Sequence, residues 1–487
     1  MTADAGLISL TAREAVGLLR RGDVSPLELV DAAAARIEAT DAALNALPTL
    51  CLDRARDHAR RIVTGQAGPP SAGPWLAGLP IAVKDLNDVA GVRTTYGSPI
   101  YANHVPDRSD LMVERLEERG AIVIGKSNTP EFGAGANTFN EVFGETRNPW
   151  NTALTPAGSS GGSAAALAAG QVWLATGSDL GGSLRTPASF CSVVGLRPSP
   201  GRVAHGPREQ PFDTLSVEGP MGRTVGDVAL MLDAMAGGHP DDPLAFDAHG
   251  ESFEAAAAVG RPPRRIAFSP DLGIVPVDPE VADICASAAR RFEELGAGVD
   301  GACPDLGDAP EAFTVLRAVG FVAGLLPVYE TRRDQLKPDV VWNIERGLRV
   351  TPVELARAEL ARGAIYRRVA EFFRTFDLLA CPAAIVPPFA VETRWVRELG
   401  GVALDNYVEW LRITSAITLT SCPAISVPCG FTRDGRPVGL QLVGRPRGEL
   451  ALLSAAAAFE ALLGLSRLVP IDPRGPLPPG GGTDPAR

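Results

Sequence analysis

The sequence predicts an α/β protein in which helices flank a central mixed β-sheet within a single large domain. Short apolar segments of strand length alternate along the chain with segments of helical periodicity. The composition, 45% hydrophobic and 21% charged, is ordinary for a soluble globular protein. No clear linker divides the chain, and 487 residues can bury a large core without a disulfide or a metal.

The N-terminal part is predicted to form two helices. Thr11 with Glu14, and Ser25 with Glu28, have the spacing of a capping box, in which each side chain satisfies a backbone N–H of the helix start. Pro26 stands at the first position of the second helix, where a missing N–H costs nothing. A Gly/Pro-rich connector over residues 65–74 then leads into the alternating part of the chain.

The alternation defines the remaining elements and the limits of the domain. We expect the domain to span residues 1–467, with a variable region at about 300–420 and a partly disordered Pro/Gly-rich C-terminal tail over 468–487. The first predicted strand ends at Lys84. The predicted strands are 79–83, 121–124, 172–176, 265–268, 424–427 and 438–443, and the predicted helices are 111–119, 163–169, 225–236, 279–295 and 450–463.

Charge, cysteine and histidine content exclude several classes of function. The net charge of −11 argues against a nucleic-acid partner, which needs clustered Lys and Arg. Seven scattered cysteines indicate free thiols in a reducing compartment, so we expect a cytoplasmic protein. No secretory signal and no run of 18–20 apolar residues is present, so no membrane is expected. None of the five His has metal-ligand spacing and there is no phosphate-binding loop, so neither a metal nor a cofactor is expected.

Two Gly/Ser loops are the chemically informative segments. One, residues 157–163, opens an Ala-rich helix, and the other covers residues 177–188. Glycine lets the backbone approach a ligand closely and adopt positive φ. Either loop alone is more typical of a flexible turn or a helix cap than of a catalytic site. Together with Lys84 at the end of a strand, they indicate a site rich in hydroxyls and free backbone N–H groups.

Ordered motifs make the chain resemble the amidase signature family. The resemblance runs from the N-terminal helices to about residue 460 and is weakest at 300–420. It rests on Gly78–Asp85, Gly125–Phe132, Asn148–Trp150, the two Gly/Ser loops, Val194–Pro198, Gly219–Met221, Pro423–Pro428 and Pro437–Gly444.

This resemblance implies a catalytic set of Lys84, Ser159 and Ser183. Ser183 would be the nucleophile that forms an acyl-enzyme. Ser159, preceded by a cis peptide bond, would relay the proton of Ser183 to an uncharged Lys84. Because an exposed lysine has a pKa near 10.4, burial must lower the pKa of Lys84 for this role. The backbone N–H groups of Leu180, Gly181, Gly182 and Ser183 would form the oxyanion hole.

Supporting roles are assigned to neighbouring residues. Ser160 either holds Lys84 or caps a helix, and both readings stay open. Asp179 and Arg185 are expected to brace the nucleophile loop. Lys126, which also follows a strand, is expected to be structural rather than a second base, and Cys191 is expected to be a packing thiol.

The substrate is expected to be a small amide. The implied substrate-binding segment, 133–140, includes Gly133, Ala134 and Gly135. Aromatic candidates for the pocket are Phe139, Tyr329, Trp342, Trp395, Tyr407 and Trp410.

We expect an amidase that cleaves a carbon–nitrogen acyl bond as a monomer or homodimer, and that also accepts aryl esters or carbamates. The alternative within the family is the A-type subunit of a glutamine-dependent amidotransferase, which works with partner chains. An inactive scaffold protein is disfavoured because all three catalytic positions are intact.

Overall fold

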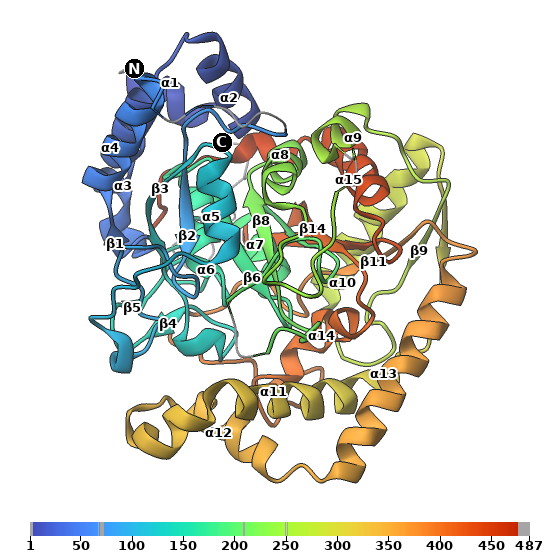
Figure 1. The fold of residues 1–487 in the computed structure, drawn as a ribbon. Helices are drawn as coiled ribbons and strands as arrows, with labels where there is room; N and C mark the ends of the chain where they lie inside the picture. The colour runs from blue at the N-terminus through green and yellow to red at the C-terminus, as the bar shows by residue number, and fades with distance from the viewer. Residues whose placement is uncertain are drawn as a thin grey trace.

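The computed structural model describes residues 3–66, 68, 73–207, 210–248, 250 and 252–475, and its centre is an eleven-stranded mixed β-sheet (Figure 1). The predicted α/β class and mixed sheet are confirmed. The strands of this sheet are β1 (Thr49–Leu50), β2 (Leu79–Lys84), β3 (Ala121–Ser127), β6 (Leu174–Asp179), β7 (Val194–Arg197), β8 (Val217–Gly222), β9 (Arg265–Phe268), β10 (Gly298–Gly301), β11 (Leu378–Pro382), β14 (Ala424–Phe431) and β15 (Pro437–Val443).

The strand order places two catalytic segments side by side. The order is β1-β3-β2-β6-β8-β7-β14-β15-β11-β9-β10, and β2 runs parallel to both β3 and β6. Parallel neighbours end at the same edge of a sheet, so the last residues of β2 and β6, Lys84 and Asp179, lie at one edge. Two short ribbons lie outside the sheet: β4 (Phe139–Asn140) with β5 (Gly144–Glu145), and β12 (Glu398–Leu399) with β13 (Val402–Ala403).

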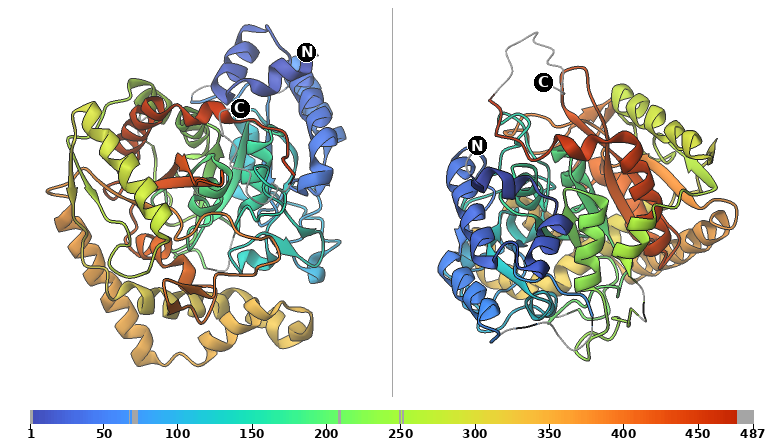
Figure 2. Two further views of the ribbon diagram at one scale, coloured as in Figure 1. Left: turned by 180° about the vertical axis from the view of Figure 1, so that it is seen from behind. Right: turned by 90° about the horizontal axis from the view of Figure 1, so that it is seen from above.

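Helices surround the sheet (Figures 1 and 2). Both predicted capping boxes are present, at Thr11 before α2 and at Ser25 before α3. The helices α8, α9 and α15 pack on one another, and α10 packs on β14 and β15. The α-helices outside the region at 300–420 are α1 (Ala3–Ser9), α2 (Ala12–Arg21), α3 (Pro26–Leu44), α4 (Leu52–Val63), α5 (Leu111–Glu118), α6 (Gly161–Ala168), α7 (Arg185–Cys191), α8 (Val225–Met235), α9 (Phe253–Val259), α10 (Pro279–Arg290) and α15 (Glu449–Leu463).

Some predicted boundaries are corrected by the sheet. Strand β6 begins at Leu174 and continues to Asp179, through residues expected to be loop, because each of its residues pairs with β8. The strands β7 and β8 are absent from the sequence prediction. Gly219 and Pro220 lie inside β8, and both residue types are disfavoured in a central strand.

The region at 300–420 is largely helical. It contains α11 (Ala309–Arg332), α12 (Pro338–Leu348), α13 (Pro352–Phe372) and α14 (Arg412–Leu419). The first three pack together as an arm along one side of the molecule, drawn in yellow and orange in Figure 1. Among the described residues, one helical span, Ala309–Gln335, is long and apolar enough to cross a membrane by length and composition. Core helices of soluble proteins pass the same test, and one third of its most apolar window is buried.

The predicted C-terminal tail begins with residues that pack on the body of the protein. Val469 and Ile471 are buried, and the Ile471 N–H donates to the Ala168 carbonyl. Arg36 forms an ion pair with Asp472. The rest of the predicted tail, 476–487, lies outside the described residues.

Candidate active site

A fully buried lysine is the centre of the site. The Nζ atom of Lys84 lies 2.7 Å from Ser159 Oγ, 2.9 Å from Ser160 Oγ and 2.9 Å from Ser178 Oγ. No part of the Lys84 side chain reaches solvent. The amine is therefore surrounded by three hydroxyls and has no carboxylate within ion-pair distance among the described residues.

The surrounding strands and loops hold Lys84 in place. All six residues of β2 are buried, and the Lys84 N–H donates to Thr176 Oγ1 on the adjacent β6 (2.9 Å). Ser159 and Ser160 precede α6, and the Gly158–Ser159 peptide bond is cis, as the family resemblance implies. A Cβ atom at Gly177 would lie only 2.8 Å from Ser160 Oγ, so glycine at this position leaves room for the hydroxyl beside the amine.

Burial changes the proton affinity of the lysine. Desolvation disfavours the charged form and lowers the pKa of Lys84 to about 7, against the smaller opposing effect of the negative charges on Glu218 and Asp179. A lysine with this pKa is uncharged in a large fraction of molecules at neutral pH. It can therefore accept a proton, which an exposed lysine cannot do.

Ser183 is half-buried in the loop that follows β6. Its carbonyl accepts a hydrogen bond from the Ser160 N–H (3.3 Å), which ties the two Gly/Ser loops together. No hydrogen bond joins the hydroxyls of Ser159 and Ser183, both of which are described. The structure thus joins Lys84 and Ser159 directly and holds Ser183 beside them through the backbone.

Asp179 organises the nucleophile loop from below. Its carboxylate accepts two hydrogen bonds from Arg185, at 2.8 and 3.0 Å, and both side chains are completely buried. Arg197 is a further partner that sequence reasoning missed, and it donates to the Asp179 carbonyl. Burial by itself would raise the pKa of Asp179, but the charges of Arg185 and Arg197 outweigh burial and hold this pKa well below its usual range.

The backbone donors of the nucleophile loop are not equivalent. Gly182 N–H donates to Asp179 Oδ1 at 2.9 Å, so this donor is already occupied. The N–H groups of Leu180, Gly181 and Ser183 have no hydrogen bond to the described part of the chain. Gly182 has φ of 120°. The loop thus leaves three of the four predicted oxyanion donors free.

Comparison with known proteins shows the family to which the chain belongs. The family model described as Amidase matches residues 28–453. The chain is 35% identical over 456 residues to an acylamidase of Rhodococcus erythropolis, covering 93% of this chain and 95% of that protein. It is 37% identical over 478 residues to the A-type subunit of a glutamyl-tRNA(Gln) amidotransferase from Moorella thermoacetica, covering 93% and 96%. The chain belongs to the amidase signature family.

A solved structure agrees with this conclusion. The crystal structure of a bacterial aryl acylamidase of the amidase signature family superposes with a TM-score of 0.86 at 29% identity, covering 95% of this chain and 99% of that one. The protein is therefore a hydrolase of the amidase type that acts on carbon–nitrogen bonds.

A large cavity of this amidase, about 1090 Å³, opens beside the nucleophile loop. Its walls come from the segments after β2 and β3, from the nucleophile loop, from residues 207 and 210–216, and from α11 and α13. The lining residues are Leu86, Tyr96, Phe132, Leu180, Pro207, all of 210–216, Leu316, Arg317, Val319, Gly320, Phe321, Gly324, Leu325, Leu355, Glu359 and Arg362. We refer to it as the catalytic cavity.

Gly133, Ala134 and Gly135, which were predicted to bind substrate, lie at the edge of the site. Gly133 lies against Ser159, because a Cβ atom there would be 3.4 Å from Ser159 Oγ. The Ala134 carbonyl accepts a hydrogen bond from Lys337 Nζ at 2.9 Å, and Gly135 packs against the same ammonium. None of the three lines the catalytic cavity.

The aromatic residues of the cavity differ from the predicted ones. Tyr407 and Trp410 are buried in the core, and Phe139 lies under the cations of Lys337 and Arg394. The aromatic residues that do line the cavity are Tyr96, Phe132, Phe212 and Phe321. Their sequence signal is weak, because they come from separate segments that only the fold brings together.

Two residues that could be mistaken for catalytic groups, Lys126 and Cys191, have structural surroundings. Lys126 Nζ forms an ion pair with Asp85 at 3.1 Å and donates to Thr94, so it has a structural partner that Lys84 lacks. Cys191 is buried, and desolvation raises the pKa of its thiol. In the described ranges, no three His, Cys, Asp or Glu side chains group together as a metal would require.

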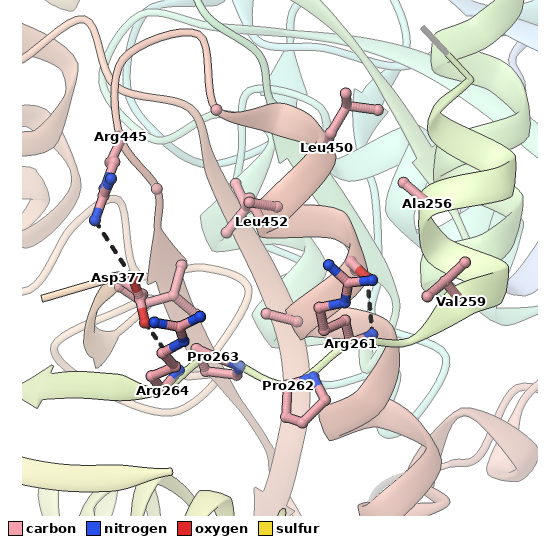
Figure 3. Close-up of a pocket in the computed structure, with 16 residues that line it drawn as sticks. Ala256, Val259, Arg261, Pro262, Pro263, Arg264, Asp377, Arg445, Leu450 and Leu452 are labelled. Atoms are coloured by element: carbon pink, nitrogen blue, oxygen red, sulfur yellow. Dashed lines mark hydrogen bonds and ion pairs between the residues drawn. The ribbon is translucent and has the colours of Figure 1, made fainter.

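A second hollow lies away from these residues (Figure 3). It measures about 500 Å³ and lies between the end of α9, residues 261–264 and the start of α15. Asp377 there accepts a hydrogen bond from the Arg264 N–H (2.8 Å) and forms an ion pair with Arg445 at 3.4 Å. Its lining contains no residue of either Gly/Ser loop, whereas Leu180 of the nucleophile loop lines the catalytic cavity.

Proposed function

We propose that the protein hydrolyses linear carboxylic amides through an acyl-enzyme on Ser183. The observation that carries the proposal is Lys84, buried without a counter-ion and surrounded by Ser159, Ser160 and Ser178. An amine in this setting is a base at neutral pH, and its hydroxyl neighbours can conduct a proton. No cofactor is needed for this chemistry.

The reaction proceeds in two halves. In the first, Ser183 Oγ attacks the amide carbon while its proton passes to Ser159 Oγ and the proton of Ser159 passes to Lys84 Nζ. The N–H groups of Leu180, Gly181 and Ser183 stabilise the tetrahedral oxyanion. The proton on Lys84 returns through Ser159 to the nitrogen of the leaving amine, and the C–N bond breaks.

In the second half, water gives its proton to the same relay and attacks the acyl carbon. Collapse of this intermediate releases a carboxylic acid and returns the proton to Ser183. Because the relay serves any acyl leaving group, aryl esters and carbamates are further substrates under this proposal.

The cavity supports a small organic amide as the substrate. A volume of about 1090 Å³ is slightly above the usual range of about 300–1,000 Å³ for small-molecule sites. The alternative, a glutamine-dependent amidotransferase A-type subunit, is favoured by the similarity to the Moorella thermoacetica protein. We prefer a free-standing amidase that works as a monomer or homodimer in the cytoplasm, because a net charge of −11 is unfavourable for binding tRNA.

The deciding experiment is an assay of the purified chain alone on a panel of anilides, aliphatic amides, carbamates and esters, with glutamine included. Release of amine from anilides, abolished in Ser183→Ala, supports the proposal. If glutamine is the one substrate of the panel that is hydrolysed, and partner proteins must be added for this activity, the amidotransferase alternative is supported.

A further inference from the structure

The lining of the catalytic cavity includes a buried cation. Arg317, on α11, lines this cavity and is 7% exposed. It has no ion-pair partner among the described residues. Its Nη2 donates to the Tyr407 hydroxyl, and its Nε is buried without a hydrogen-bond partner. Burying a charge is costly unless it is paired.

The other buried arginines show how unusual this is. Arg185 and Arg197 pair with Asp179, and Arg202 pairs with Glu449. Arg223 has no carboxylate, but it donates to the carbonyls of Ile8 and Leu10. Arg197 also has buried nitrogens without a hydrogen-bond partner, but of this group only Arg317 lines the catalytic cavity.

Aromatic rings hold the guanidinium in place. Its carbon lies 4.5 Å from the ring centre of Phe321 and 5.5 Å from that of Tyr407. Asn343 donates to the Tyr407 hydroxyl at 2.6 Å, so this phenol is itself fixed. A guanidinium stacked and oriented in this way is prepared to form hydrogen bonds with an anion.

The second arginine of the cavity lies near two carboxylates. Arg362 donates to Thr214 Oγ1 at 2.6 Å. Burial lowers its pKa, while the nearby carboxylates of Glu359 and Asp213 act in the opposite direction. The charged residues of the lining are thus two arginines and two carboxylates, and the carboxylates lie near Arg362, whereas Arg317 has no ion-pair partner among the described residues.

Arg317 is also within reach of a substrate held at the nucleophile. Phe313, one helical turn before it on the same face of α11, touches the nucleophile loop, because a Cβ atom on Gly181 would lie 3.3 Å from its ring. One turn corresponds to about 5–6 Å along the helix axis. A substrate group several bonds from the scissile amide would meet the guanidinium.

From these contacts we infer that the amidase recognises an amide whose substrate molecule also carries a carboxylate, and that Arg317 binds this carboxylate. A carboxylate supplies the missing counter-charge and the acceptors for the unused N–H groups. The inference rests on the proposed function and specifies its substrate class. Since the chain as a whole carries −11, the attraction must come from this local cation rather than from the overall charge.

The test compares matched substrates. Glutaryl 4-nitroanilide is paired with 5-methylhexanoyl 4-nitroanilide, in which an isopropyl group replaces the carboxylate at the same chain length. A second pair, 4-acetamidobenzoate and 4-methylacetanilide, places the carboxylate on the leaving amine. We expect kcat/KM to favour the acidic member of one pair by about 10- to 100-fold, as a hydrogen bond to a charged group is typically worth.

Arg317→Met should reduce this ratio to about 1, and Arg317→Lys, which keeps the charge, should retain part of it. Arg357→Met is the control, because Arg357 is exposed on the neighbouring α13 and does not line the cavity. This variant should keep the wild-type ratio. A wild-type ratio near 1 for both pairs, or an Arg317→Met variant with an unchanged ratio, would overturn the inference while leaving the amidase proposal intact.

Binding of the acidic products separates the two proposals. If no anilide is hydrolysed, the proposed function fails, and calorimetry with glutarate and 4-aminobenzoate still tests Arg317. Binding by the wild type but not by Arg317→Met supports the carboxylate site. No binding of either acid to the wild type would refute it.

Discussion

Asp179 and Arg185 form a completely buried ion pair directly behind the nucleophile loop, with Arg185 Nη2 2.8 Å from Asp179 Oδ1. The same carboxylate accepts the Gly182 N–H and the Leu184 N–H. One side chain therefore both neutralises buried cations and sets the shape of the loop that carries Ser183. Stability and catalysis are expected to depend on it together.

Asp179→Asn should be strongly destabilising. It leaves the charges of Arg185 and Arg197 buried without a counter-ion, and breaking a buried pair in this way typically costs about 3–5 kcal/mol. Denaturant unfolding would measure the loss. Asp300→Asn is the matched control, because Asp300 forms an exposed pair with Arg265 and should cost less than about 1 kcal/mol. Equal losses in the two variants would contradict the structural role of Asp179.

The pH dependence of kcat/KM should report Lys84. Only the uncharged amine can act as a base, so activity should rise with pH, with a midpoint near the pKa of about 7, and level off above it. One pH unit below the midpoint, the rate should be about one tenth of the plateau. Burial also raises the pKa of Asp110 to about 7, so Asp110→Asn is the control and should keep the midpoint. A flat profile between pH 6 and 9 would argue against a lysine base.

The three hydroxyls around Lys84 should differ in importance. Ser159→Ala interrupts the proton relay and should lower kcat by about 10³-fold or more, comparable with the loss of a general base. Ser178→Ala and Ser160→Ala each remove only one hydrogen bond that holds the amine, and about a tenfold loss is expected. Single-turnover kinetics of the three variants on one anilide would rank them. A loss in Ser178→Ala as large as that in Ser159→Ala would place Ser178 in the relay.

Two adjacent glycines of the nucleophile loop offer a matched pair. In Gly182→Ala, the new Cβ would lie 2.3 Å from Thr414 Oγ1, at a residue whose φ is 120°, so the loop must shift. In Gly181→Ala, the nearest atom is a ring carbon of Phe313 at 3.3 Å, which a small movement relieves. We expect kcat to fall by at least about 10²-fold in Gly182→Ala, as for the loss of an oxyanion donor, and by much less in Gly181→Ala. Similar kinetics of the two variants would mean that loop shape is not limiting.

Local patterns were sufficient where the physical cause is local. The capping boxes at Thr11 and Ser25 depend on residues three apart, and the structure has both. The apolar run at residues 79–83 predicted strand β2, which ends at Lys84. By contrast, Gly219 and Pro220 lie within the unpredicted β8, where pairing with β6 and burial override their low strand preference.

The sequence by itself determined the family, the α/β class and the residues expected to react, because the Gly/Ser loops and Lys84 belong to short ordered motifs. Only the tertiary structure decided what those residues touch. Lys84 Nζ donates a hydrogen bond to Ser178 Oγ, Arg197 donates to the Asp179 carbonyl, and Arg317 lines the cavity without an ion-pair partner among the described residues. The members of each of these contacts come from elements far apart in the chain. Burial and long-range contact set charge and hydrogen bonding at these positions, and neither follows from the spacing of residues along the chain.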